Sequence, residues 1–328
     1  MQPTPLHPFA TLTPDVILDA VESLGMRSDC RVFALNSYEN RVFQVGLEDA
    51  PPLIAKFYRP ERWNDAQIRE EHAFCFELAD LDIPVVAPMR IDGESLFAHK
   101  AFRFALYPRK GGHAPELDNL DNLLTLGRMM GRIHAAGAVR AYQHRPALTL
   151  RTFGEESVAF VRDQFIPPHR REVYASICAD LLTAMTAVEQ RLGPVRPVRT
   201  HGDCHSGNIL WRDDAPHFVD FDDSRMAPAI QDLWMMLSGD RPRQLTQLAE
   251  LIEGYDEFYR FDPRELPLIE VLRTLRILHY TAWLARRWQD PAFPACFPWF
   301  NTERGWDEHI LQLREQLSAL QDPPLALF

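Results

Sequence analysis

The residues best suited to chemistry lie between positions 201 and 223, where polar side chains flank two short apolar runs. The segment 201–211 reads HGDCHSGNILW, and the segment 218–223 reads FVDFDD. The apolar runs predict two buried strands, over 209–211 and 217–219, joined by a turn over 212–216, because Asp and Pro favour turns. A hairpin brings its two ends together, so we expect the side chains of Asp203, Asn208 and Asp220 to converge on one point.

These three side chains are suited to phosphoryl transfer. A carboxylate on a rigid loop, here Asp203, orients a hydroxyl nucleophile and accepts its proton. Mg²⁺ prefers oxygen ligands and neutralises the charge that develops on phosphate, and Asn208 and Asp220 would supply one neutral and one anionic oxygen. The sequence therefore predicts Asp203 and Asp220 as catalytic residues, with Asn208 and Asp220 as the metal ligands.

The same segment permits a second interpretation as a transition-metal site. His201, Asp203 and His205 alternate as in a metal cluster, and Cys204 could act as a ligand or nucleophile. Alternating side chains do not all face one ion unless the loop is sharply irregular, and no further histidine-rich segment completes the set. We therefore interpret His201 as a residue that bonds the loop backbone under Asp203, and we assign no role to Cys204 or His205.

A lysine in the N-terminal third is the second candidate. Lys56 lies within the apolar run LIAKF at 53–57, where an unpaired ammonium would be costly. Alternation along a strand places it on the face opposite its apolar neighbours. The helix predicted over 65–81 carries Glu71, and a Lys–Glu ion pair positions a lysine for nucleotide phosphates. Glu70 competes for this role, but Glu71 lies on the predicted apolar face of the helix.

The turn between the first two predicted strands is the third candidate. It reads LNSYENR at 35–41 and contains no glycine. In kinases this turn covers the nucleotide phosphates, usually through glycine-rich backbone amides. Ser37 can replace them with its hydroxyl and amide groups, so Ser37, Lys56 and Glu71 are the predicted nucleotide-binding residues. An ordinary hairpin turn is the alternative interpretation.

The order of predicted elements indicates an α+β protein with two lobes. Residues 1–108 form a small antiparallel-sheet lobe with one long helix, and residues 109–328 form a mainly helical lobe that carries the hairpin. The proline-rich stretch 1–14 is expected to be an arm without fixed structure. The last strands of the first lobe are expected over 85–91, 94–97 and 102–107.

Two polar residues of the helical lobe are assigned structural roles. Asp232, which precedes an apolar helical run, is expected to accept hydrogen bonds from the backbone of the loop around Asp203. His134 lies on the apolar side of a predicted helix over 117–136, where a histidine is more often a satisfied core residue than a ligand.

The composition excludes several classes of protein. Lys and Arg number 35 against 46 Asp and Glu, a formal charge of −11, which argues against a nucleic-acid-binding surface. The five cysteines are scattered without a C-x-x-C pair, and no leader-like apolar stretch begins the chain, so we expect a reduced, cytoplasmic protein. No apolar run approaches the ~20 residues of a membrane span. A monomer is expected.

The sequence resembles the bacterial stress response kinase A family, in the aminoglycoside phosphotransferase branch of the protein-kinase-like fold. The resemblance rests on four blocks: LNSYENRV at 35–42, KFYRPERW at 56–63, HGDCHSGNILWR at 201–212 and DPAFP at 290–294. It implies a bilobal fold and a cytoplasmic, ATP- and Mg²⁺-dependent Ser/Thr protein kinase of the stress response, whose partner is a protein substrate.

The resemblance also carries roles over to individual residues. By motif, Asp203 is the catalytic base, Asn208 and Asp220 hold Mg²⁺, and Ser37 lies on the ATP-covering turn. Lys56 and Glu71 follow from the wider fold and complete the predicted nucleotide site.

Two other functions remain open at this stage. One is a small-molecule kinase acting on an amino alcohol, a sugar or an aminoglycoside, because the acidic balance together with Asp222 and Asp223 would suit a cationic substrate. The other is a nucleotide-binding module without catalysis, and the joint presence of Lys56, Asp203, Asn208 and Asp220 argues against it.

Overall fold

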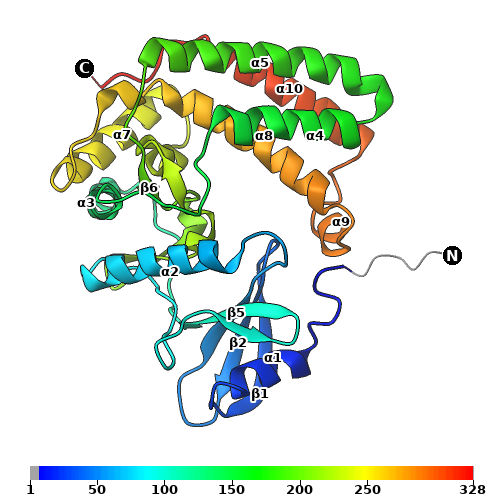
Figure 1. Ribbon diagram of the computed structural model, residues 1–328. Helices are drawn as coiled ribbons and strands as arrows, with labels where there is room; N and C mark the ends of the chain where they lie inside the picture. Colours follow the sequence, from blue (N-terminus) through cyan, green and yellow to red (C-terminus); the bar gives the residue numbers. More distant parts are fainter. Residues whose placement is uncertain (1–6, 328) are drawn as a thin grey trace. The chain divides into compact units, whose positions relative to one another are not determined.

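The computed structural model describes residues 7–327, which divide into two compact units. The first contains the described residues up to Glu116 together with Tyr142–Arg145 and His205–Ser224; the second contains Leu117–Ala141, Pro146–Cys204 and the described residues from Arg225 onward. Figure 1 shows the chain coloured along its sequence, from blue at the N-terminus to red at the C-terminus. The predicted lobe limits, 1–108 and 109–328, stay a prediction.

The first unit is built on a five-stranded antiparallel sheet in the order β1-β2-β3-β5-β4. The strands are β1 (Ser28–Leu35), β2 (Arg41–Leu47), β3 (Leu53–Phe57), β4 (Phe97–His99) and β5 (Phe102–Pro108). The first three strands pair in sequence order, so the predicted meander is confirmed.

The strand expected over 85–91 is wrong. Pro84 and Pro88 lack the N–H group that a strand ladder needs. The segment therefore forms isolated backbone hydrogen bonds and bridges instead of a continuous ladder. Val85 forms an isolated bridge to Phe218, and the amide of Met89 donates to the carbonyl of Leu106 at 2.7 Å.

The two faces of this sheet are covered by different elements. Helix α1 (Pro14–Glu22), capped by the Thr13 side chain, packs its buried residues against the face that carries Ala55 and Phe57. Helix α2 (Asp65–Asp80) contributes Ile68 to a separate cluster with Tyr58, Leu96 and Ala105. Each fully buried aliphatic or aromatic side chain contributes roughly 1.5–3 kcal/mol, so these clusters fix both helices to the sheet.

The expectation of an unstructured arm over 1–14 is wrong for the part that the structure describes; residues 1–6 lie outside it. Phe9 is buried, and its ring stacks on Phe102 with centroids 6.1 Å apart. The guanidinium of Arg41 lies 4.6 Å from the same ring centroid. An aromatic ring supplies enough apolar area to order a proline-rich segment.

The predicted hairpin is present in the first unit, with a shorter turn than expected. Strands β7 (Ile209–Arg212) and β8 (Ala215–Phe218) pair antiparallel and leave only Asp213 and Asp214 between them. Both turn residues have positive φ, 52° and 57°, as a two-residue type I′ turn requires. The predicted turn over 212–216 is therefore too long, since Pro216 pairs with Trp211 in the ladder.

The second unit is mainly helical, as predicted. Its helices are α3 (Leu120–Gly137), α4 (Glu156–Gln164), α5 (Arg171–Leu192), α6 (Ile230–Leu233), α7 (Arg241–Asp256), α8 (Leu268–Arg287), α9 (Ala292–Cys296) and α10 (Glu303–Ala319), with a two-stranded ladder of β6 (Val198–Thr200) and β9 (Arg225–Ala227).

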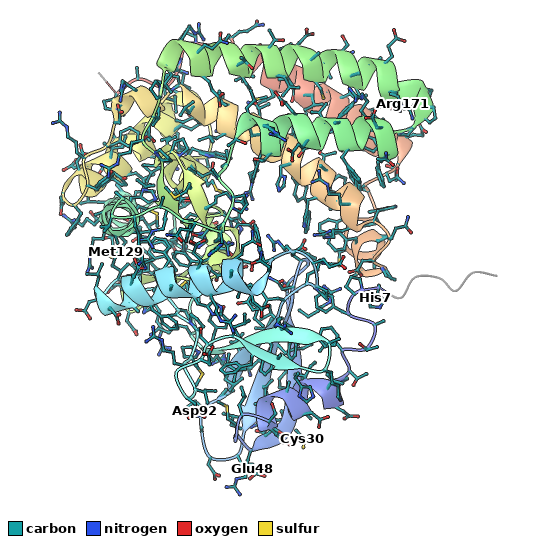
Figure 2. The ribbon with its side chains drawn as sticks, viewed as in Figure 1. His7, Cys30, Glu48, Asp92, Met129 and Arg171 are labelled. Atoms are coloured by element: carbon teal, nitrogen blue, oxygen red, sulfur yellow. The ribbon has the colours of Figure 1, made fainter. Side chains whose placement is uncertain are left out.

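Close helix contacts hold the second unit together. Helix α3 packs against α7 through Gly127 and Gly131, where a Cβ atom would meet the carbonyl oxygens of Leu251 and Tyr255. Helices α5 and α10 lie side by side, and α8 packs against α4 and α5 (Figure 1). Side chains fill the space between these helices (Figure 2).

Within residues 7–327, no helix combines the length and the apolar character needed to cross a membrane.

Candidate active site

Lys56 forms the centre of a buried charge network in the first unit. Its Nζ lies 2.7 Å from Oδ1 of Asp220 and 3.3 Å from Oδ1 of Asp222. Burial acts to lower the pKa of the Lys56 ammonium, but the two carboxylates outweigh it and hold this pKa well above its usual value. Lys56 is therefore positively charged, and it lies on the face of β3 opposite Ala55 and Phe57, as the alternation predicted.

The predicted Lys56–Glu71 ion pair is not formed. In the described part of the chain, the Lys56 ammonium pairs with the two aspartates instead, and Oε2 of Glu71 lies 3.6 Å from Nη1 of Arg145. Glu71 is buried, and this desolvation raises the pKa of its carboxyl to about 7 against the lowering effect of Lys56 and Arg145. Glu71 therefore makes no direct bond to Lys56, and its charge adds only to the larger effect of the two aspartates that raises the pKa of the Lys56 ammonium.

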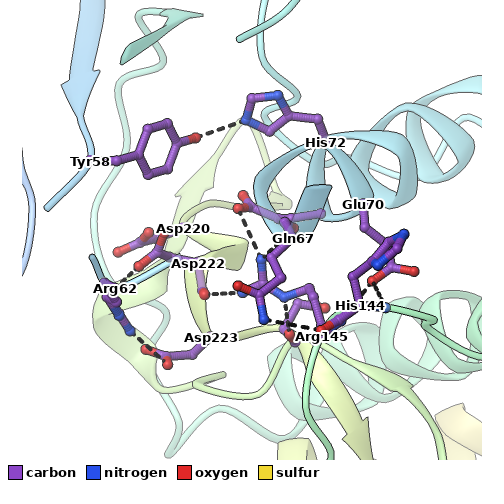
Figure 3. A network of polar contacts seen from close by, with 12 residues as sticks. Tyr58, Arg62, Gln67, Glu70, His72, His144, Arg145, Asp220, Asp222 and Asp223 are labelled. Atoms are coloured by element: carbon purple, nitrogen blue, oxygen red, sulfur yellow. Dashed lines mark hydrogen bonds and ion pairs between the residues drawn. The ribbon is translucent and has the colours of Figure 1, made fainter. Parts of the chain in front are cut away.

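Glu70 is engaged elsewhere in the same unit. Its carboxylate accepts hydrogen bonds from the backbone amides of Gln143, His144 and Arg145 at 2.5–2.9 Å. Figure 3 shows Glu70 on α2 directed toward the segment that carries His144 and Arg145. Of the two neighbouring glutamates, Glu71 is the one beside the lysine.

Asp222 is the acid of this network whose contacts the sequence analysis did not predict. It is 3% exposed, and its carboxylate binds the side chains of Arg62 and Asn40 as well as Lys56. Burial acts to raise the pKa of Asp222, but Arg62 and Lys56 reverse this and bring the pKa to about 2. Figure 3 shows Arg62 reaching both Asp222 and Asp223. These acids are already neutralised within the chain.

The charged state of Asp222 makes the stability of the protein depend on acid pH. A carboxyl whose pKa is lowered on folding stabilises the fold above its usual pKa near 4 and loses this contribution as the pH falls toward 2. For a pKa of about 2 the full contribution is about 2 kcal/mol. The free energy of unfolding can be measured in urea for the wild type and for Asp222→Asn. We expect the difference between the two proteins to shrink by about 1 kcal/mol from pH 6 to pH 3.

Asp213→Asn is the matched control for this measurement, because the Asp213 side chain is 85% exposed in the turn of the hairpin that precedes Asp222. The difference in free energy of unfolding between Asp213→Asn and the wild type should not change with pH. A difference between the wild type and Asp222→Asn that stays constant from pH 6 to pH 3 would contradict the assigned ion pairs.

The glycine-free turn is held in place by the same network. Asn40 is buried; its Oδ1 accepts from the Arg59 amide, and its Nδ2 donates to Asp222 at 3.1 Å. The Ser37 hydroxyl donates to the Asn40 carbonyl at 3.0 Å, so it closes the turn in this structure. The amide of Ser37 is the group left for the predicted phosphate contact.

The hairpin brings the two predicted metal-binding positions together. The carbonyl of Asn208 accepts a hydrogen bond from the amide of Val219 at 3.0 Å, one residue before Asp220. Asp220 has a left-handed backbone, φ 62° and ψ 62°, which is uncommon for a residue other than glycine. Its side chain is 52% exposed. Convergence of Asp203 with this pair stays a prediction from the sequence.

Asp203 belongs to the second unit, where a buried polar cluster supports its loop. The backbone amides of His201 and Gly202 donate to the two carboxylate oxygens of Asp232 at 2.6 and 2.9 Å. His134 lies between Asp232 and the Tyr255 hydroxyl, at 3.0 and 2.9 Å. The predicted structural roles of Asp232 and His134 are therefore confirmed.

The side chains around Asp203 act within the loop. Nδ1 of His201 accepts from the Asp203 amide at 3.4 Å, as predicted for a loop-holding histidine. Nδ1 of His205 accepts from the Gly207 amide at 3.0 Å. Cys204 is fully buried, and this burial raises the pKa of its thiol well above the usual range, which does not suit a nucleophile.

Removing the Asp232 carboxylate should weaken the loop of Asp203. Asp232→Ala leaves the buried amides of His201 and Gly202 and the His134 ring without their acceptor, at a cost of about 1–3 kcal/mol for each group. We expect the free energy of unfolding in urea to fall by about 3 kcal/mol or more. Asp180→Ala on α5 is the control, because Asp180 is an exposed acid of the same unit; it should cost less than about 0.5 kcal/mol. Equal losses would contradict this role of Asp232.

Three comparisons with known proteins bear on this site. A model of the phosphotransferase enzyme family matches residues 31–269. Stress response kinase A from Escherichia coli O157:H7 is 46% identical over 320 residues, which is 97% of each chain. The serine/threonine protein kinase RdoA from Salmonella typhimurium strain LT2 is 44% identical over the same shares.

Solved structures resemble the chain in fold at low sequence identity. An amicoumacin kinase in complex with AMP-PNP, Ca²⁺ and Ami has a TM-score of 0.71 at 18% identity and covers 94% of both chains. A microcompartment-associated aminopropanol kinase has a TM-score of 0.66 at 18% identity, covering 92% of this chain and 96% of its own. These likenesses confirm the predicted α+β, kinase-like fold class.

Proposed function

Because the chain belongs to the phosphotransferase enzyme family and, within that family, groups with stress response kinase A, we propose that it uses ATP to phosphorylate proteins. In this proposal the γ-phosphate of ATP is transferred to a serine or threonine hydroxyl. The buried Lys56 paired with Asp220 carries the nucleotide part of the proposal. The protein acceptor is supported by relatives at 44–46% identity that are named stress response kinase A and serine/threonine protein kinase.

In the proposed reaction each group has one task. The acceptor oxygen forms a bond to the γ-phosphorus, and the bond from that phosphorus to the β-phosphate oxygen breaks, with its electron pair leaving on ADP. Asp203 accepts the proton of the acceptor hydroxyl. Lys56 and the amide of Ser37 bind phosphate oxygens, while the charge of Glu71 helps to keep the lysine protonated.

A divalent cation fits the residues of the first unit. Asp220 offers an exposed carboxylate, and the buried Oδ1 of Asp222 has no hydrogen-bond partner apart from its ion pair with Lys56. Carboxylate and amide oxygens are the ligands that Mg²⁺ prefers. Asp220 and Asn208 would hold the ion, which neutralises phosphate charge when bound. The amicoumacin kinase complex with AMP-PNP and Ca²⁺ supports nucleotide binding with a divalent cation.

The cellular setting belongs to the same proposal. The five cysteines form no disulfide, and Cys75, Cys178 and Cys204 are buried as free thiols. This state is stable in a reducing compartment, which supports a cytoplasmic kinase, and we propose that it acts as a monomer.

The second candidate function is transfer to a small hydroxylated molecule, because the fold relatives include an aminopropanol kinase and a spectinomycin phosphotransferase. Labelled ATP, offered with a panel of dephosphorylated proteins and a panel of amino alcohols and sugars, separates the two. We expect label on protein serine or threonine. Rapid turnover on a small molecule with no protein labelled would overturn the proposed acceptor.

A further inference from the structure

The carboxylate of Asp203 has an arginine partner that the sequence analysis did not identify. Arg276 lies on α8, 73 positions further along the chain, and its Nη1 donates to Oδ1 of Asp203. The side chains are 43% and 24% exposed, respectively. The guanidinium of Arg276 therefore lies beside the carboxylate of Asp203, which would receive the proton of the acceptor hydroxyl. Both side chains are partly accessible to solvent.

Most of the hydrogen-bonding capacity of this guanidinium is unused. Among residues 7–327, Asp203 is the one residue with which Arg276 forms a hydrogen bond or an ion pair. A guanidinium carries five N–H donors in a planar fork that matches carboxylate and phosphate groups. The other donors of Arg276 are therefore available to an anionic group of a bound molecule.

The same face of α8 continues with aromatic rings. Tyr280 and Trp283 follow Arg276 at i+4 and i+7, positions that share one face of a helix. Tyr280 is exposed, and its ring stacks on Trp283 with centroids 5.5 Å apart. Phe293 of α9 packs edge-on against Trp283 at 5.0 Å, which fixes the ring. Arginine, tyrosine and tryptophan are the residues enriched where proteins bind other chains.

The charges near Asp203 do not suit a cationic acceptor. A cationic amine placed beside Arg276 would meet a like charge, which is costly at short range. Asp222 and Asp223, which the sequence analysis considered for such a substrate, are paired with Arg62 in the first unit. The group that Arg276 favours is an anion.

We propose that Arg276 is a specificity residue that binds an acidic side chain next to the acceptor hydroxyl of the protein substrate. Tyr280 and Trp283 contact the residues that follow. This inference rests on the proposed transfer to a protein and adds the substrate class, namely serine or threonine in an acidic sequence. The substrate carboxylate and Asp203 share the guanidinium, which brings the hydroxyl beside the carboxylate that accepts its proton.

A pair of peptides tests this inference. Both contain one serine and differ only in whether the flanking positions are glutamate or glutamine. For the wild type we expect kcat/KM to be about 10-fold higher for the glutamate peptide, the ratio for one favourable charge contact of about 1.4 kcal/mol. Arg276→Gln should bring this ratio close to one, and Arg276→Lys should restore part of it because the charge is kept.

The ratio separates recognition from a purely structural role. If Arg276 only held Asp203 in place, Arg276→Gln would lower kcat for both peptides and leave their ratio unchanged. Arg128→Gln is the control, because it removes an exposed Arg–carboxylate pair, Arg128–Glu257, in the same unit; it should alter neither the rate nor the ratio.

Two results would overturn the inference in different ways. A wild-type ratio at or below one, or an unchanged ratio in Arg276→Gln, removes the role of Arg276 while leaving transfer to protein intact. No label on either peptide, together with turnover on a small molecule, removes the protein acceptor and this inference with it.

Discussion

We expect Asp203→Asn to lower kcat for phosphoryl transfer by about 10²–10⁴-fold, the usual contribution of a positioned general base. An amide keeps the shape of the side chain and one oxygen for Arg276, but it does not accept the proton of the acceptor hydroxyl. The affinity for ATP should be almost unchanged, since Lys56 and Asp220 lie in the other unit and keep their bond. The measurement is steady-state transfer of labelled phosphate, with ATP affinity measured by calorimetry.

Asp163→Asn is the control for this substitution. Asp163 also pairs with an arginine, Arg162, in the second unit, but on the surface of α4. We expect it to retain wild-type activity. Equal activity of Asp203→Asn and the wild type would exclude Asp203 as the base, whereas a parallel loss of ATP affinity would point to a misfolded loop.

We expect Asp220→Asn to lower activity by about 10³-fold or more, because the metal ion that Asp220 is proposed to hold would supply several kcal/mol of charge stabilisation to phosphoryl transfer. Unlike Asp203→Asn, it should also remove the dependence of ATP binding on Mg²⁺. The amide does not provide the anionic oxygen that a hard cation prefers. Lys56 keeps Asp222 as a partner at 3.3 Å, so the fold should persist. The measurement is ATP affinity with and without Mg²⁺.

The exposed turn of the same hairpin provides the control for Asp220. Asp213→Asn keeps a residue that tolerates positive φ and removes one acid from the same segment, so it should bind Mg·ATP like the wild type. If Asp220→Asn still bound ATP more tightly with Mg²⁺ than without, Asp220 would not be a metal ligand.

Local patterns in the sequence were sufficient to predict the local placement of several residues of the candidate site. Period-2 alternation gave the correct face for Lys56, and the apolar runs gave the hairpin whose ends join Asn208 to Val219. Helix periodicity favoured Glu71 over Glu70, and Glu71 is the buried one. These features depend on neighbours close in sequence, which a single sequence records.

Contacts between residues that lie far apart in the chain could not be predicted from these local patterns. Lys56 bonds Asp220 across 164 positions and Arg276 bonds Asp203 across 73; no spacing rule connects them. The direct Lys56–Glu71 pair was wrong because Arg145, from a short segment between helices, takes the Glu71 carboxylate. Phe9 was missed because one aromatic residue among prolines gives no periodicity.

The most direct test of the proposed function is the fate of the γ-phosphate in a single turnover. Enzyme in excess over γ-labelled ATP is mixed with Mg²⁺ and a protein acceptor, and the label is located by mass spectrometry. We expect label on serine or threonine of the acceptor for the wild type, and for Asp203→Asn we expect ATP to bind but to be consumed about 10²–10⁴-fold more slowly. Equal labelling rates for both proteins, or consumption of ATP by the wild type without label on the acceptor, would contradict the proposed function.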